Sequence, residues 1–231
     1  MTDRWEQIDA DGGAFKAFVA APSGPPRGAV VVIQEIFGVN EGVRGKCAWL
    51  AGEGYLAIAP DLFWRLEPGV ELTDKTEGEW KRAFDLMNRF NPETGVADIQ
   101  RTVDHVRASA KIAKVGAVGY CLGGLLAYLT ACRTTADAAV GYYGVSIDQK
   151  LAEAATLSTP LMLHIAGKDQ FVPKAAQDAI VAGLGDKPGV SLHVYPDQDH
   201  AFTRVGGAHF DAHAAELADA RTVAFFRQHI G

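Results

Sequence analysis

The chain has 231 residues, of which 48% are hydrophobic, and a formal net charge of −6. A chain of this size can bury one substantial core, so we expect residues 1–231 to form a single domain. The acidic balance and the lack of a basic run argue against a nucleic-acid partner and against binding to an anionic membrane surface. The longest apolar runs fall well short of the ~18 residues of a membrane span, and charges at Asp3, Arg4 and Glu6 interrupt any signal-peptide pattern.

The cysteines point to the compartment. Cys47, Cys121 and Cys132 are few, odd in number and without metal-ligand spacing. This usage predicts a reduced, cytoplasmic protein with no disulfide framework and no cysteine metal site. The sequence does not fix the oligomeric state, and we expect a monomer or a weak homo-oligomer.

In chain order, turn and apolar patterns predict alternating strands and helices. The first 20 residues read as a hairpin around the Asp11-Gly12-Gly13 turn, and residues 62–94 read as an irregular excursion over one end of a sheet. Further strands are expected at 29–33, 55–59, 115–118, 138–142, 160–165 and 190–194. Helices are expected around Leu50 and at 77–90, 96–110, 122–132, 175–184 and 217–230.

This alternation predicts an α/β protein with a doubly wound, mainly parallel sheet and helices on both faces. In such sheets, ligands bind beyond the carboxyl ends of the strands. Glu35, Cys121, Asp169 and His200 each come just after a predicted strand, and the four strands are different. We therefore expect these four side chains to converge on one edge of the sheet.

The stretch Gly119-Tyr-Cys121-Leu-Gly123 joins a short apolar strand to a helical pattern. It matches the G-x-S-x-G nucleophile elbow with cysteine in place of serine. A strand that turns at once into a helix strains the middle residue and leaves no room for side chains on either flank. The turn also leaves the amide of Leu122 free at a helix N-terminus, where it can bind an oxyanion. The alternative is that Cys121 is only a small buried hydrophobe.

The order of Cys121, Asp169 and His200 is the order nucleophile, acid, histidine of the α/β-hydrolase fold. His200 would take the thiol proton and later activate water, and Asp169 would orient the imidazole. Asp197 and Asp199 lie near His200 and are alternatives for the acid, although Asp169 has the expected place at a strand end. His164 lies inside an apolar strand, so a buried structural role is expected; the remaining histidines are expected on helices or on the surface.

Several sequence blocks resemble the dienelactone hydrolase family, a cysteine-dependent branch of the α/β-hydrolases. They span nearly the whole chain: Gln34-Glu-Ile-Phe-Gly-Val-Asn40, Pro60-Asp-Leu62, Gly119-Tyr-Cys-Leu-Gly-Gly124, Gly141-Tyr-Tyr-Gly-Val145, Gly167-Lys-Asp-Gln-Phe-Val-Pro173 and His200-Ala-Phe-Thr-Arg204. The resemblance implies a Cys121–His200–Asp169 triad that hydrolyses small lactones or esters through a thioester. It implies neither a metal nor an organic cofactor, and its partner would be a small substrate that bears a carboxylate.

The resemblance also implies roles that spacing alone does not give. Glu35 would contact the nucleophile's sulfur in the resting enzyme, and the amides of Ile36 and Leu122 would form the oxyanion hole. Arg204 would bind the substrate carboxylate, because a guanidinium fork can bond both carboxylate oxygens. Tyr143 would lie in the substrate pocket.

One part of the pocket departs from the family pattern. The positions of a second pocket arginine and a tyrosine are taken by Trp80 and Phe84, which we expect to line the substrate site. Lys81 and Arg82 are adjacent, so a shifted helix could still supply a cation. A pocket with one arginine and more aromatic surface favours a larger or less charged ester.

Three other functions remain open from the sequence. A broad-specificity carboxylesterase would use the same triad on different substrates. A non-catalytic binding protein could use the fold only to hold a ligand, since fold does not determine function. A thiol redox sensor would need a resolving cysteine, and neither Cys47 nor Cys132 lies in the Cys121 motif.

Overall fold

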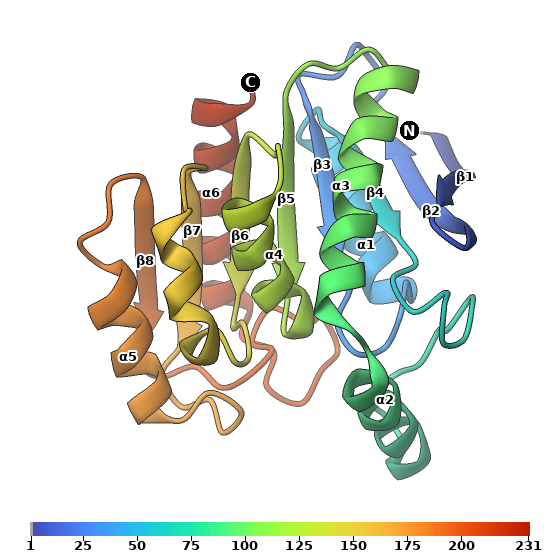
Figure 1. Ribbon diagram of the computed structural model, residues 1–231. Helices are drawn as coiled ribbons and strands as arrows, with labels where there is room; N and C mark the ends of the chain where they lie inside the picture. The colour runs from blue at the N-terminus through green and yellow to red at the C-terminus, as the bar shows by residue number, and fades with distance from the viewer. Residues whose placement is uncertain (1) are drawn as a thin grey trace.

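A computed structural model describes residues 2–231. Its strands form one sheet in the order β1-β2-β4-β3-β5-β6-β7-β8 (Figure 1). The first two strands form an antiparallel hairpin whose second strand pairs antiparallel with β4, and all other pairings are parallel. The predicted α/β architecture with a mainly parallel sheet is therefore confirmed.

The strands are β1 Thr2–Ala10, β2 Gly13–Ala21, β3 Ala29–Ile33, β4 Leu56–Pro60, β5 Val115–Tyr120, β6 Ala138–Tyr142, β7 Leu161–Ala166 and β8 Val190–Tyr195. The helices are α1 Glu41–Gly52, α2 Glu77–Arg89, α3 Pro92–Ser109, α4 Leu122–Arg133, α5 Lys174–Leu184 and α6 Ala212–His229, with a 3-10 helix, η1, at Asp148–Ala155.

The central strands are apolar because both faces of the sheet are covered. In the five central strands, β4, β3, β5, β6 and β7, every residue is buried. Helices α3, α4 and α5 lie in front of the sheet, and α1 and α6 lie behind it (Figure 1). A strand enclosed in this way cannot alternate apolar and polar residues, which explains the continuous Val, Ile and Ala runs.

The excursion begins at Asp61, directly after β4. The Asp61 carboxylate accepts hydrogen bonds from the amides of Phe63 (3.1 Å) and Gly69 (2.7 Å), which fold the loop back on itself. Helix α2 follows and extends past the carboxyl ends of the parallel strands (Figure 1). Its first turn is held by a capping box, in which the Glu79 amide donates to Thr76 Oγ1 (3.3 Å) and Thr76 Oγ1 donates to the Glu79 carboxylate (2.8 Å). The excursion therefore supplies a wall at the edge where ligands bind.

One element was not expected from the sequence. The 3-10 helix η1 was not anticipated, since its eight residues are too few to give a clear helical period. In α6, Leu217 is exposed, and the buried residues combine the small Ala214, Ala218 and Thr222 with Val223 and Phe226.

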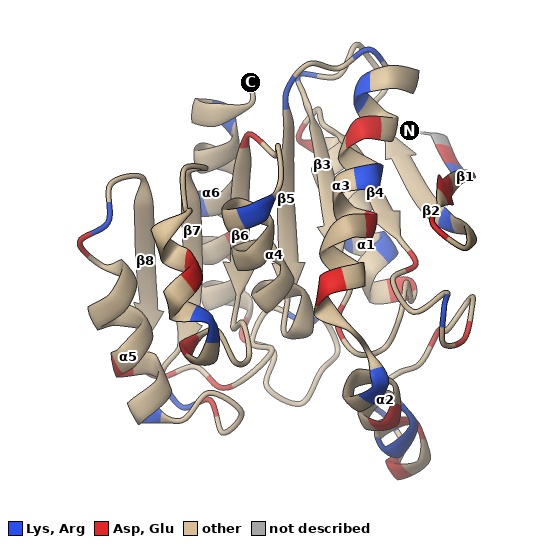
Figure 2. Cartoon of the chain, viewed as in Figure 1, with Lys and Arg blue, Asp and Glu red and all other residues tan. Residues whose placement is uncertain are grey.

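Charged residues of both signs are interspersed over the surface, including on α2 (Figure 2). None of the helices within residues 2–231 combines the length and the apolar character that crossing a bilayer requires.

Candidate active site

Cys121 occupies the tight turn between β5 and α4. Its backbone has φ 57° and ψ −114°, a conformation that non-glycine residues rarely adopt. A Cβ atom on Gly119 would lie 1.9 Å from the carbonyl oxygen of Gly123, and a Cβ on Gly123 would lie 2.5 Å from the carbonyl oxygen of Ile33. Both flanking glycines are therefore required by close backbone packing. The second contact also brings the end of β3 against the elbow.

The structure brings His200 and Asp169 together as a buried pair. His200 follows β8, Asp169 follows β7, and His200 Nδ1 lies 2.7 Å from Asp169 Oδ2. Only 6% of the His200 side chain and 1% of the Asp169 side chain are exposed. The other oxygen of Asp169 accepts from the amides of Phe171 (2.8 Å) and Val172 (3.3 Å), so the carboxylate is fixed on both sides.

The environment of His200 favours its charged form. Burial lowers the pKa of an imidazole, but the interactions of His200 with Cys121 and Asp169 outweigh it and raise the His200 pKa to about 10. A histidine in this setting can hold the proton released by a thiol. The ring is also packed edge-on by Tyr143 and Phe171, at centroid distances of 5.0 and 4.8 Å, which restricts its rotation.

The two alternative acids take other roles in the structure. Asp197 is 84% exposed and pairs with Lys168 at 3.3 Å. Asp199 accepts from the backbone amide of His200 (3.2 Å) and lies 3.6 Å from His209 Nδ1. Among residues 2–231, the only carboxylate hydrogen-bonded to the His200 ring is that of Asp169.

The two amides expected to bind an oxyanion make no hydrogen bond to a protein group within residues 2–231. Within the described chain, neither the Ile36 amide nor the Leu122 amide donates a hydrogen bond to another residue. Leu122 is the first residue of α4, where backbone N–H groups have no helical partner. Because Gly123 lies against Ile33 and Gln34, the segment that carries Ile36 is held beside the elbow.

Glu35 makes a different contact from the one expected. Its carboxylate accepts two hydrogen bonds from Arg204, from Nε (2.8 Å) and from Nη2 (3.0 Å). No hydrogen bond joins Glu35 to Cys121 in the part of the chain that the structure describes. A bidentate, charge-assisted pair is much stronger than a carboxylate–thiol contact, so the guanidinium takes the carboxylate in this state.

Arg204 also contacts a third charged residue, Asp74. Its Nη1 donates to Asp74 Oδ2 at 3.0 Å, and its guanidinium lies 5.1 Å from the centre of the Phe37 ring. Burial lowers the pKa of an arginine, but Glu35 and Asp74 raise the pKa of this guanidinium above its ordinary value. Arg204 is thus a partly buried cation held between two carboxylates.

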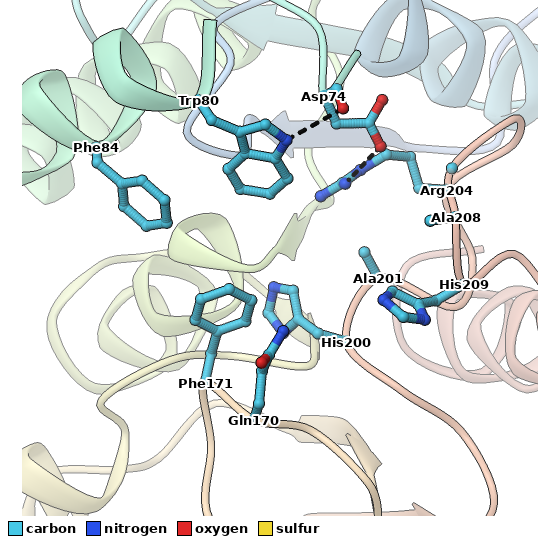
Figure 3. Close-up of a pocket in the computed structure, with 11 residues that line it drawn as sticks. Asp74, Trp80, Phe84, Gln170, Phe171, His200, Ala201, Arg204, Ala208 and His209 are labelled. Carbon is cyan, nitrogen blue, oxygen red and sulfur yellow. Dashed lines mark hydrogen bonds and ion pairs between the residues drawn. The ribbon is translucent and has the colours of Figure 1, made fainter. Parts of the chain in front are cut away.

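A cavity of about 410 Å³ opens beside His200 and Arg204. Figure 3 shows Trp80 and Phe84 on one side, Phe171 and His200 on the other, and Asp74 joined to Arg204 at one end. Trp80 and Phe84 are stacked with their ring centres 5.5 Å apart. The structure therefore places both residues in the wall where the sequence comparison put them, and their role in binding stays a prediction.

Neither neighbouring cation reaches this cavity. Lys81 and Arg82 are absent from its wall, and Arg82 instead pairs with Glu67 on the surface. The helical phase explains this, because residues one and two positions after Trp80 point to other sides of α2. Arg204 is consequently the single arginine among the residues that line the cavity.

A second cavity, of about 690 Å³, lies on the other side of Arg204. Arg204 and Asp74 line both cavities, whereas Glu35 and Tyr143 line only the second. The Tyr143 hydroxyl is hydrogen-bonded to Thr203 Oγ1 at 3.0 Å, and its ring touches His200. Tyr143 thus lies next to the histidine in the wall of the second cavity, and its place in the substrate pocket stays a prediction.

Comparison with known proteins agrees with this geometry. Residues 15–230 match the model of the dienelactone hydrolase family. The chain belongs to the dienelactone hydrolase family.

Individual relatives support the assignment. The chain is 50% identical to a putative carboxymethylenebutenolidase of Azospirillum brasilense, with 96% of each chain covered. It is 38% identical to a carboxymethylenebutenolidase of Pseudomonas putida, with 93% of this chain and 92% of the relative covered. The crystal structure of a putative dienelactone hydrolase from Klebsiella pneumoniae superposes with a TM-score of 0.87 at 28% identity, covering 99% of each chain. The α/β-hydrolase fold and the family predicted from the sequence are confirmed.

The other two cysteines of this family member, Cys47 and Cys132, are buried and favour the neutral, unreactive thiol. Burial raises the pKa of the Cys47 thiol well above its ordinary value and raises that of Cys132 to about 11. His164 is buried inside β7, where its ring bonds to Tyr195 and Thr222, and burial lowers its pKa. The buried, hydrogen-bonded position of His164 matches the structural role that the sequence predicted for it.

Sequence reasoning did not single out Asp74 or Phe171. Phe171 lies within the matched Gly167–Pro173 block, so the block itself was a signal that could have drawn attention to it. Asp74 lies in an irregular stretch before α2 and had no such signal. Its contact with Arg204 joins residues 130 positions apart, which only the folded structure reveals.

Proposed function

We propose that this dienelactone hydrolase opens small enol lactones and cleaves activated esters by attack of the Cys121 thiolate. The observation that carries the proposal is the combination of Cys121 on a strained elbow with the buried His200–Asp169 pair. Strained backbone is costly and persists where the surrounding structure enforces it, commonly at active sites. Tyr143 and Ala201, at φ 39° and 61°, are also strained and flank His200 in space and in sequence.

The reaction proceeds in two halves. His200 takes the thiol proton, and the thiolate of Cys121 adds to the lactone carbonyl. The amides of Ile36 and Leu122 stabilise the resulting oxyanion, whose collapse breaks the ring C–O bond and leaves a thioester on Cys121. The departing enolate takes a proton from His200 and becomes a ketone. His200 then deprotonates a water molecule, which cleaves the thioester and releases the acid.

The nucleophile limits the substrate class. A tetrahedral intermediate on cysteine can expel the thiolate as easily as an alkoxide, so simple alkyl esters and amides return to substrate. An enolate or a phenolate leaves readily, and its departure drives the reaction forward. We therefore expect turnover of enol lactones and aryl esters and little activity on peptides or long-chain lipids.

Arg204 would orient substrates that carry a carboxylate, since it is the cation in the cavity wall next to His200. A substrate carboxylate that draws Arg204 away would release Glu35 from its two hydrogen bonds to the guanidinium, while His200 stays the acceptor of the thiol proton. The relatives named carboxymethylenebutenolidase support a butenolide lactone as the natural class of substrate.

A panel of enol lactones, aryl esters and alkyl esters tests the proposal, with the Cys121→Ala protein as the blank. Turnover of the first two classes, absent in the variant, is the expected result. Turnover that survives in Cys121→Ala would remove Cys121 from the mechanism. Tight binding of a lactone without turnover would instead indicate a ligand-binding protein.

A further inference from the structure

Each of the three nitrogen atoms of the Arg204 guanidinium already donates to a carboxylate. Nε and Nη2 donate to Glu35, and Nη1 donates to Asp74, which leaves one further N–H on each of Nη1 and Nη2. Arg204 belongs to a segment whose own backbone is anchored, since its amide donates to the carbonyl of Ala201 at 2.9 Å. A substrate carboxylate must therefore share the guanidinium with Glu35 and Asp74 or displace one of them.

The two competing carboxylates bond different nitrogen atoms of the arginine, Glu35 at Nε and Nη2 and Asp74 at Nη1. Asp74 lines both cavities, including the 410 Å³ cavity next to His200, whereas Glu35 lines only the other cavity. Figure 3 shows Asp74 bonded to Arg204 at the end of the substrate cavity. An anion that enters this cavity consequently meets the Asp74 side of the guanidinium first.

The position of Asp74 is fixed by its neighbours. Its backbone carbonyl accepts a hydrogen bond from Trp80 Nε1 at 3.1 Å, so the indole that forms the cavity wall also holds the Asp74 backbone. The side-chain Nζ of the next residue, Lys75, donates to the carbonyl of Gly206, which links this stretch to the loop after Arg204. The Asp74 backbone is therefore held through its carbonyl, next to the cavity wall.

Asp74 stays ionised in the range where the enzyme would work. Burial alone would raise the pKa of its carboxyl, but the hydrogen bond and charge of Arg204 hold that pKa below its ordinary value. Asp74 and Glu35 offset the charge of Arg204 and that of Lys75, whose Nζ lies 3.4 Å from Asp74 Oδ1. An incoming carboxylate therefore meets a cation that is already compensated and gains less than it would from a free arginine.

We propose that Asp74 is an internal carboxylate that occupies the anion-binding face of Arg204 and shifts specificity toward uncharged enol lactones and aryl esters. The inference deepens the proposed function, because it assumes that the 410 Å³ cavity is the substrate site. Asp74→Asn keeps the size of the side chain and an oxygen for Arg204, but it removes the charge that repels a substrate carboxylate.

Binding of benzoate and of its uncharged analogue benzamide tests the inference without relying on turnover. In calorimetric titrations, Asp74→Asn should bind benzoate on the order of 10-fold more tightly than the wild type, the effect of one lost charged competitor. Benzamide should bind both proteins equally. Asp85→Asn is the matched control, since Asp85 is on exposed α2 surface paired with Arg89, and it removes the same charge away from the cavity.

Steady-state kinetics supplies the second measurement. Asp74→Asn should raise, by a similar ~10-fold, the ratio of kcat/KM for an enol lactone that carries a carboxylate to kcat/KM for a neutral aryl ester, through the KM of the charged substrate. Equal benzoate affinity in wild type and Asp74→Asn, or equal effects on charged and neutral ligands, would overturn the role of Asp74. If the wild type turned over no lactone or ester, the proposed function would fail, while the titrations would still decide the role of Asp74.

Discussion

Replacing Asp169 by asparagine tests the assignment of the acid most sharply. The carboxylate of Asp169 accepts from the amides of Phe171 and Val172 through one oxygen and bonds His200 Nδ1 through the other, at 2.7 Å. Asparagine can keep its oxygen on the two amides, which turns its NH₂ group toward His200. The ring must then carry its proton on the nitrogen that should face the thiol, so it cannot act as a base.

The expected cost follows from this change of tautomer. The same substitution lowers kcat about 10⁴-fold in a serine triad. A thiol is more acidic than a hydroxyl and depends less on its base, so we expect a loss of about 10²- to 10⁴-fold, or roughly 3 to 5 kcal/mol of barrier. The assay is kcat on an aryl ester, and KM should change little because Asp169 does not line the substrate cavity.

Asp197→Asn and Asp199→Asn are the matched controls, since both remove one charge close to His200 in the sequence. Neither residue bonds the imidazole, so each variant should keep activity within about threefold of wild type, in the range of most surface changes. If Asp199→Asn produced the large loss, or if Asp169→Asn retained most of the wild-type kcat, Asp169 would not be the acid.

Four further predictions follow from the same contacts. Cys121→Ser should fold normally, as judged by its thermal midpoint, but turn over aryl esters at least ~10²-fold more slowly, because a hydroxyl is a poor nucleophile in a site arranged for a thiol; equal rates would mean that the thiol is not needed. Glu35→Gln should slow lactone turnover and change the rate of Cys121 alkylation by iodoacetamide between about pH 5 and 9, because the negative charge of the Glu35 carboxylate near the thiol is lost. Alkylation profiles that superimpose on those of the wild type would show that Glu35 does not control the thiol. Arg204→Ala should lower the free energy of unfolding by about 3 kcal/mol, because the carboxylates of Glu35 and Asp74 lose their cation. Adding Glu35→Gln to this variant should restore part of the lost stability. If the effects of the two substitutions on the free energy of unfolding were additive, Glu35 and Arg204 would not be coupled. The His200 pKa of about 10 lies above its unfolded value near 6.5, so the contribution of His200 to stability is complete below about pH 6.5 and is lost as the pH rises toward 10. Urea unfolding should therefore show that the difference in unfolding free energy between wild type and Asp169→Asn shrinks over this interval. A difference that grew with pH would be inconsistent with a raised pKa.

The sequence predicted the parts of this fold that depend on local pattern. The buried runs of β3, β5 and β7 are apolar because helices cover both faces of the sheet, and this signal survives without any tertiary information. The elbow was predictable for the same reason. A Cβ atom at Gly119 would lie 1.9 Å from the Gly123 carbonyl oxygen, and one at Gly123 would lie 2.5 Å from the Ile33 carbonyl oxygen. Glycine is needed at both positions because a strand turns directly into a helix beside another strand.

The charge relationships within the site were less accessible from the sequence. Glu35 was expected beside the sulfur, yet Arg204 binds it, because an ion pair between residues 169 positions apart leaves no local pattern. Asp74 was not foreseen at all, since its turn-like stretch carries no periodicity. Tyr143 was expected in the pocket wall; it lines the cavity that Glu35 also lines, and its role in binding stays a prediction. Long-range pairing is thus the feature that had to come from the structure.

The central claim is that Cys121 forms a thioester with its substrate, and intact-mass spectrometry of the protein after rapid mixing with an aryl ester tests it most directly. The wild type, quenched in acid within the first turnover, should gain the mass of one acyl group, and peptide mapping should place that group on Cys121. Cys121→Ala should gain none. An acyl group on another residue, or ester turnover in the wild type with no acylated Cys121 at any quench time, would contradict the claim.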